Sequence, residues 1–192
     1  MLEERRNMEA VKAAGVREGG KKGNSMRCVE IDKVVVNIGV GESGEKLARA
    51  EKVLTMITGQ KPVKTLAKKT IQPFGIKKGE PIGVKVTLRK ERAREFLKKA
   101  FKIQNKFLDW QFDEFGNFSF GVEEHMDFGI PYDPDIGIFG MDVCISFKRP
   151  GFRIAERKIQ KKRRIPARHK LSKAEVIEYL KKEFGVEVVE EL

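Results

Sequence analysis

The 192-residue sequence has few of the residues that build disulfides, zinc sites or membrane spans. Its two cysteines are too few for a disulfide framework. It has only two histidines and no Cys-x-x-Cys pair, so a structural zinc site has no support. Its longest apolar runs are far shorter than the ~20 residues that cross a bilayer. Its first residues, Met-Leu-Glu-Glu-Arg-Arg, lack the apolar stretch of a signal peptide. We therefore expect a reduced, cytoplasmic protein.

Positive charge is concentrated in two segments of the chain. There are 40 Lys and Arg against 28 Asp and Glu, a net charge of +12. Residues 28–90 carry +7 and residues 148–170 carry +10, whereas residues 91–147 carry −5. Concentrated positive charge favours a polyanion as partner, because each cation placed at a phosphate releases a condensed counterion. An anionic membrane surface is the main alternative for residues 148–170.

The hydrophobic pattern predicts an α+β fold with one mainly antiparallel sheet and helices packed mostly on one face, a two-layer sandwich. Residues 1–25 are expected to form an N-terminal helix, over 2–14, and a flexible linker. Residues 26–192 are expected to form a single domain that includes the basic segment 148–170. Strands are predicted at residues 28–40, 61–69, 82–89, 117–122, 139–147 and 186–189, and helices at 44–58, with Ser43 as N-cap, 91–103 and 173–185, with Ser172 as N-cap.

Residues 39–44, Gly-Val-Gly-Glu-Ser-Gly, fit the G-x-G-x-x-G pattern of dinucleotide-binding turns and lie between an expected strand and an expected helix. Such a site also needs an acidic residue ~20 positions further on for the ribose, yet no Asp or Glu occurs between Lys52 and Gly79. Glu42 and Glu45 would bring negative charge to the pyrophosphate. We therefore interpret this segment as a tight structural turn, with a nucleotide-dependent enzyme as the alternative function.

The histidines and cysteines form no recognisable catalytic or metal-binding constellation. His125 lies in Glu-Glu-His-Met-Asp, which we interpret as an acidic surface loop, because nothing supplies a nucleophile or oxyanion donors. Cys28 and Cys144 fall in strand patterns, where a small buried side chain is the usual role. We expect no enzymatic activity, no cofactor and no metal.

Three segments combine basic side chains with aromatic or amide groups, the mixture that RNA recognition uses. Residues 68–78 place Phe74 between two pairs of lysines in a Gly- and Pro-rich loop. Asn37 interrupts an apolar strand, where a purely structural hydrogen bond is an equally good interpretation. Residues 148–170 are irregular and contain Pro150 and Pro166, which favours an arm lying along phosphates over an amphipathic helix in a membrane.

Several of these segments together resemble one family. IDKVVVNIGVGE, ITGQKP, TIQPFGIKKGEPIGVKVTLR and RPGFRIAERK follow in the same order as in the fifth protein of the large ribosomal subunit. The similarity runs from about residue 26 to about residue 184, and RPGFRIAERK with its basic extension resembles archaeal and eukaryotic members. Residues 1–25 match no pattern of the family.

The resemblance implies a structural RNA-binding protein of the large subunit. Members of the family bind 5S ribosomal RNA and large-subunit rRNA, lie in the central protuberance with the eighteenth large-subunit protein, and approach the peptidyl-site tRNA. Matching positions predict rRNA contacts at Lys33, Asn37, Gln60, Phe74, Thr87 and Arg89. The basic segment adds four further predicted contacts, Arg149, Arg153, Arg157 and Lys158. The loop expected to contact tRNA presents Lys68, Lys69, Thr70, Gln72, Lys77 and Lys78. No membrane partner is expected.

Overall fold

The computed structural model describes residues 24–189, which fold around a five-stranded sheet with the order β2-β3-β1-β6-β5. Every neighbouring pair in this sheet is antiparallel. The strands are β1 (Glu30–Gly39), β2 (Val63–Leu66), β3 (Pro81–Leu88), β5 (Phe118–Val122) and β6 (Met141–Lys148). The predicted α+β class with a mainly antiparallel sheet is confirmed.

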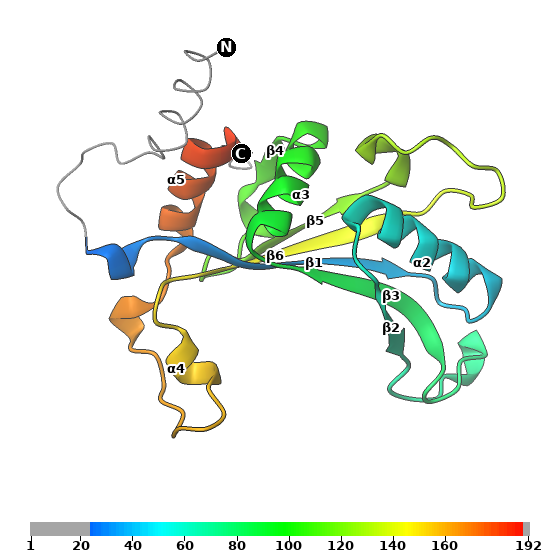
Figure 1. Cartoon of the computed structure of the whole chain (residues 1–192), viewed down its shortest axis with the longest axis horizontal. Coiled ribbons are helices and arrows are strands. Elements are labelled where there is room, and N and C mark those ends of the chain that lie inside the picture. The colour runs from blue at the N-terminus through cyan, green and yellow to red at the C-terminus, as the bar shows by residue number, and fades with distance from the viewer. Residues whose placement is uncertain (1–23, 190–192) are drawn as a thin grey trace, which may run out of the picture.

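Three helices lie on one side of this sheet, as Figure 1 shows. They are α2 (Glu45–Thr58), α3 (Lys90–Ile103) and α5 (Lys173–Phe184), and the single-turn α4 (Arg153–Glu156) lies on the other side. Apolar residues at helical spacing place one stripe of each long helix against the sheet. In α3 this stripe includes Phe96, Leu97, Ala100 and Phe101, which are all buried as expected.

The core lies between the sheet and the helices because each strand alternates between an inward and an outward side chain. Val34, Val36 and Ile38 of β1 are at most 1% exposed. A cluster of phenylalanines fills the space beneath α3, where the Phe101 ring lies 5.6 Å from that of Phe107. Most of the aromatic content of the chain therefore serves packing, with a few exposed rings available for other roles.

A second, two-stranded sheet pairs β4 (Lys106–Leu108) with β7 (Glu187–Val189) in parallel. The strand at residues 186–189 was expected, but β4 was not, because three residues carry no readable alternation. The helix predicted at residues 2–14 lies outside the described residues. Within residues 24–189, no helix is both long enough and apolar enough to span a membrane.

Three local predictions are wrong. Ser43 does not cap α2: Gly44 holds that position, and Ser43 Oγ instead donates a hydrogen bond to Glu80 Oε1 at 2.6 Å. Cys28 and Cys144 are exposed rather than buried. His125 is 1% exposed and not part of a surface loop, since its Nδ1 lies 3.4 Å from the Phe139 amide and accepts its hydrogen bond.

Candidate RNA interface

The side of the main sheet that faces away from α2, α3 and α5 forms an uncovered polar surface (Figure 1). We call it the open face. Because side chains alternate along each strand, the residues next to the buried positions point to it. Its members are Lys33, Val35 and Asn37 of β1, Lys85 and Thr87 of β3, Ser119 and Gly121 of β5, and Asp142, Cys144 and Ser146 of β6.

Asn37 and Thr87, two predicted rRNA contacts, share this face. Asn37 stands opposite Lys85 in β3 and opposite Asp142 in β6, at the centre of the sheet. Thr87 stands opposite Val35, one row along. Both residues are half-buried, so each is partly open to solvent. Lys33 lies at the outward position of β1 beyond Val35, so the fold places all three side chains on one face.

Arg89 lies at the end of β3, where it takes part in a shared ion pair. Its Nη1 lies 3.3 Å from Asp32 Oδ1, and Lys148 Nζ of β6 lies 2.9 Å from the same oxygen. The Asp32 side chain is 14% exposed, whereas that of Arg89 is 56% exposed. One carboxylate thus holds two cations at this end of the sheet, and the Arg89 guanidinium still reaches solvent.

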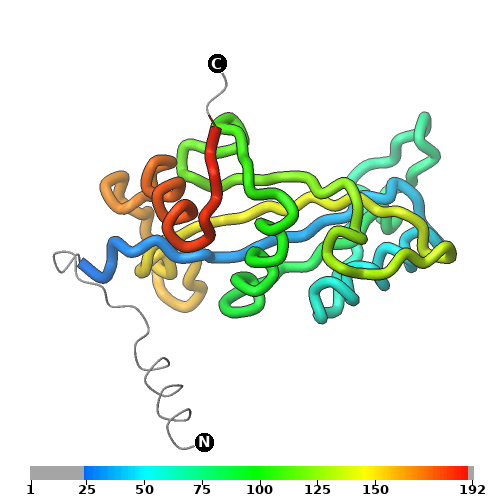
Figure 2. Tube along the Cα trace, turned by 90° about the horizontal axis from the view of Figure 1, so that it is seen from above, coloured from blue at the N-terminus to red at the C-terminus, as the bar shows by residue number. Residues whose placement is uncertain are grey.

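Gln60 and Phe74 lie away from the centre of the open face. Gln60 is half-buried in the connection between α2 and β2, and its amide N–H lies 3.4 Å from Thr58 Oγ1. Phe74 lies in the short 3-10 helix Gln72–Phe74 at the tip of the connection between β2 and β3 and is 76% exposed. This connection projects on the side of the open face, at one end of the sheet (Figures 1 and 2).

The connection between β2 and β3, residues 67–80, is a hydrogen-bonded loop that we call the basic loop. Ile71 and Ile76 form a two-way backbone bridge that narrows it below the tip. Gly75 turns the chain there with φ 67°. The six predicted tRNA-contacting residues are all exposed on this loop: Lys68, Lys69, Thr70, Gln72, Lys77 and Lys78. Thr70 also has a structural role, because its Oγ1 accepts the Lys78 amide hydrogen bond at 3.1 Å.

Glu80 ties the base of the basic loop to the turn before α2. Its carboxylate accepts hydrogen bonds from the Lys77 amide at 2.9 Å and from Ser43 Oγ at 2.6 Å. The Lys77 amide, followed by the Ser43 hydroxyl, lowers the pKa of Glu80 below its usual value of 4.5. At neutral pH an ionised carboxylate therefore ties the base of the loop to the turn before α2.

At the other end of the sheet, residues 149–170 form a basic arm that also projects on the side of the open face (Figure 1). Its first residue, Arg149, does not present its guanidinium to solvent: it is 4% exposed and pairs with Glu175 of α5. Burial opposes ionisation of Glu175, but hydrogen bonds from Arg149 and Ser172 outweigh it and lower the Glu175 pKa. Arg149 thus joins the arm to α5.

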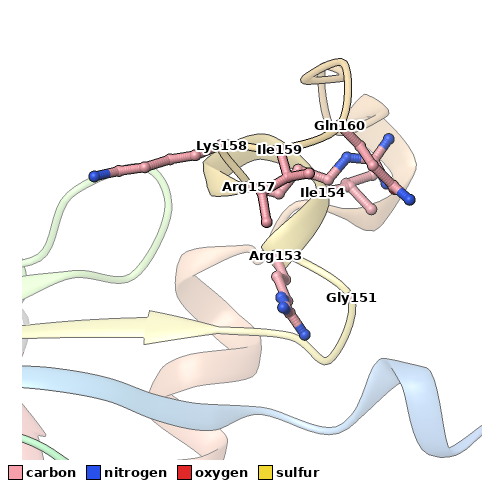
Figure 3. A pocket seen from close by; sticks show the side chains of 7 residues that line it. All are labelled: Gly151, Arg153, Ile154, Arg157, Lys158, Ile159 and Gln160. Carbon is pink, nitrogen blue, oxygen red and sulfur yellow. The ribbon is translucent and has the colours of Figure 1, made fainter.

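The other three predicted contacts of the arm lie around a hollow of about 540 Å³. Arg153, Arg157 and Lys158 line it together with Ile154 and other residues (Figure 3). Arg153 and Lys158 are exposed, and Arg157 is half-buried. In Figure 3 Lys158 extends away from the other labelled side chains.

In the glycine-rich turn at residues 39–44, two backbone amides donate hydrogen bonds to another part of the fold and not toward a ligand site. The N–H groups of Val40 and Gly41 donate to the Ile82 carbonyl at 3.1 and 2.9 Å. Glu42 forms an ion pair with Lys46 at 3.0 Å. A phosphate-binding turn needs amides that point at the ligand. These contacts agree with the interpretation of this segment as a structural turn.

Two family models together match most of the described residues. One, described as "Ribosomal protein L5", matches residues 24–77, and the other, which describes the C-terminus of the same ribosomal family, matches residues 81–179. The chain belongs to the L5 family of large-subunit ribosomal proteins. The two models meet at the end of the basic loop, between the paired strands β2 and β3.

Relatives from archaea agree with this membership. The large ribosomal subunit protein uL5 of Methanococcus vannielii is 53% identical over 171 residues, which cover 86% of this chain and 94% of the relative. The uL5 proteins of Sulfurisphaera tokodaii and Thermoplasma volcanium are each 54% identical, over 170 and 169 residues, and cover 87% and 86% of this chain and 96% and 99% of the relatives.

Membership in the L5 family confirms the predicted large-subunit protein and its location on cytoplasmic ribosomes. Ribosomal RNA and other ribosomal components are its partners, and the relatives are ribosomal proteins, not enzymes. The contacts predicted from the sequence do not include Lys85, which lies on the open face, or Lys148, which pairs with Asp32. The signal for Lys85 is present in the alternation of IGVKVTLR, which places Lys85 on the same face as Thr87.

Proposed function

We propose that the open face binds 5S ribosomal RNA and helps anchor it in the central protuberance of the large subunit. The observation that carries the proposal is the row Lys85–Asn37 at the centre of an uncovered sheet face, with a basic projection at each end of the same side. Sheets that bind RNA offer such faces, with cations on phosphates and amides or hydroxyls on base edges. Phe74 extends the surface onto the basic loop, and Arg89 extends it toward the basic arm at the opposite end of β3. Gln60 adds a contact just before the edge strand β2.

We further propose that the basic loop contacts the peptidyl-site tRNA. Its exposed lysines are suited to a phosphate backbone, and the exposed Phe74 ring is suited to stack on a base or a ribose. The ordered base of the loop supports this role, because a loop fixed before binding loses less conformational entropy.

The basic arm is proposed to bind large-subunit rRNA, with the eighteenth large-subunit protein as a neighbour in the assembly. Arg153 and Lys158 are exposed for phosphate contacts. Arg149 is assigned a different task, because its guanidinium is buried against Glu175. Through its ion pair with Glu175, Arg149 orients the arm relative to α5.

The proposal is tested by filter binding of the purified full-length chain to archaeal 5S rRNA, with unrelated structured RNA as competitor. We expect selective binding, and if about six phosphates are neutralised, log K falls against log salt with a slope of about −4 to −5. Equal displacement by unrelated RNA would refute the 5S assignment. Thermal stabilisation by millimolar NAD or ATP would instead favour the nucleotide-dependent enzyme.

A further inference from the structure

We propose that residues 157–161 are a preformed docking loop for A-form large-subunit rRNA, in which Ile159 enters the shallow minor groove and Arg157 positions the loop. This inference rests on the proposed function of the basic arm and adds the contacting element. It assigns Arg157 a positioning role within the protein, in place of the phosphate contact expected from the sequence.

Each of the three nitrogens of the Arg157 guanidinium donates a hydrogen bond within its own loop. Its Nε and Nη2 both donate to the Lys161 carbonyl, at 3.1 and 2.8 Å, and its Nη1 donates to Gln160 Oε1 at 2.7 Å. Five residues of chain are thereby closed around one planar cation. A guanidinium provides donors in a fixed fork, which an ammonium group cannot reproduce.

Backbone hydrogen bonds hold the base of this loop. The Arg157 amide donates to the Arg153 carbonyl at 2.9 Å, at the end of α4, and the Arg163 amide donates to the Ile154 carbonyl at 3.2 Å. The loop thus begins and ends on α4. Its conformation is fixed before any partner arrives, which reduces the entropy lost on binding.

The loop presents one exposed apolar side chain within a basic stretch of the chain. Ile159 is 101% exposed, whereas Ile154 and Ile165 of the same arm are half-buried. Burial in the fold therefore does not account for isoleucine at this position. Figure 3 shows it on the loop held by Arg157, with Lys158 extended to one side.

The charges around Ile159 favour RNA as the occupant. Residues 157–170 contain no Asp or Glu and eight Lys and Arg. The minor groove of an A-form helix is wide and shallow, displays ribose groups and has phosphates along both edges. A small apolar side chain between cations matches that surface, because the lysines reach phosphates while the isoleucine lies against the sugars.

The first test replaces the apolar tip. Ile159→Ser is compared with Ile138→Ser, which changes another exposed isoleucine (57% exposed) in the acidic part of the chain. Binding to deproteinised archaeal large-subunit rRNA is measured over a range of salt. We expect Ile159→Ser to weaken binding about tenfold at an unchanged salt slope. We expect Ile138→Ser to bind as the parent chain does.

The second test separates positioning from direct contact. Arg157→Lys keeps the charge but loses the fork that closes the loop. We expect it to bind the same rRNA about tenfold more weakly and to be cleaved faster by trypsin after Lys158 and Lys161. A direct phosphate contact predicts instead near-parental affinity and unchanged cleavage, and that result overturns the positioning role.

Further outcomes distinguish this inference from the proposed function. Parental rRNA affinity in Ile159→Ser overturns the docking loop and leaves the function of the open face untouched. If the parent chain binds neither 5S nor large-subunit rRNA, the proposed function fails. If Ile159→Ser loses binding only to phosphatidylglycerol vesicles or to polyglutamate, the loop serves a membrane or an acidic protein, and the RNA assignment is wrong.

Discussion

Lys148 Nζ lies 2.9 Å from Asp32 Oδ1 and links β6 to β1 beside the open face. Arg89 reaches the same oxygen from the end of β3 at 3.3 Å. Asp32 therefore joins the three central strands of the sheet through one carboxylate whose side chain is 14% exposed. The same contact holds two cations at the edge of the proposed RNA surface, so stability and charge placement depend on one residue.

Asp32→Asn tests this link. We expect the free energy of unfolding to fall by about 0.5–1.5 kcal/mol, because the amide keeps the shape but loses the charge-assisted bonds to Arg89 and Lys148. Urea denaturation measures the change. Glu30→Gln, on the exposed start of β1, serves as control and should change little. Equal stability of Asp32→Asn and the parent chain would contradict the structural role of the cluster.

Asn37→Ala and Thr87→Ala test the centre of the open face. Each should weaken 5S rRNA binding by about 1–3 kcal/mol, since each removes a hydrogen-bonding group from the surface. Lys98→Ala, on the exposed side of α3, removes a charge from the helix-covered side and should have little effect. Filter binding gives the affinities, and circular dichroism checks the fold. Unchanged affinity in both variants would exclude this face as the binding surface.

Cys144 lies on the open face, so the rate at which its thiol is alkylated reports whether RNA covers this face. Partial desolvation of the exposed Cys144 thiol, followed by the charge of Asp142, raises its pKa above the usual value of 9.0, so alkylation should accelerate only at alkaline pH. Bound 5S rRNA should slow alkylation of Cys144 in a Cys28→Ser chain, as measured by mass spectrometry. Alkylation that proceeds at the same rate with saturating RNA would mean that the RNA lies elsewhere.

Glu80 makes the order of the basic loop depend on pH. Because its pKa is lowered in the folded state, the stabilisation is complete above the ordinary value of 4.5 and is lost as pH falls through the lower folded value. An NMR titration should place the Glu80 midpoint below 4.5. Glu80→Gln should speed trypsin cleavage after Lys77 and Lys78 at neutral pH. Glu42→Gln, on the neighbouring turn, serves as control and should leave the rate of trypsin cleavage after Lys77 and Lys78 unchanged.

Elements with long, regular patterns were predictable from the sequence. The apolar stripe of α3 and the alternation of β3 identified a helix and a strand within one or two residues of their observed bounds. Asn37 and Thr87 were expected as contacts, and the register of β1 and β3 brings them to one face. Their role in binding 5S rRNA stays a prediction.

Features that depend on contacts between distant segments were not predictable in the same way. Ser43 has the side chain of an N-cap, but Glu80, 37 positions later, takes its hydroxyl. Arg149 looked like one cation of a basic segment, and only the packing of α5 shows that Glu175 buries it. Cys144 is different: it alternates with the buried Val143 and Ile145, so the pattern already indicated an outward position.

The central place of β1 has a consequence for synthesis of the chain. β1 pairs on one side with β3 and on the other with β6, which begins only at Met141. Until residue 148 has left the exit tunnel, one edge of β1 has no partner, and its apolar side chains lack part of their cover. Unpaired apolar edges favour aggregation of nascent chains. A factor that shields β1 during translation should therefore raise the yield of the folded protein.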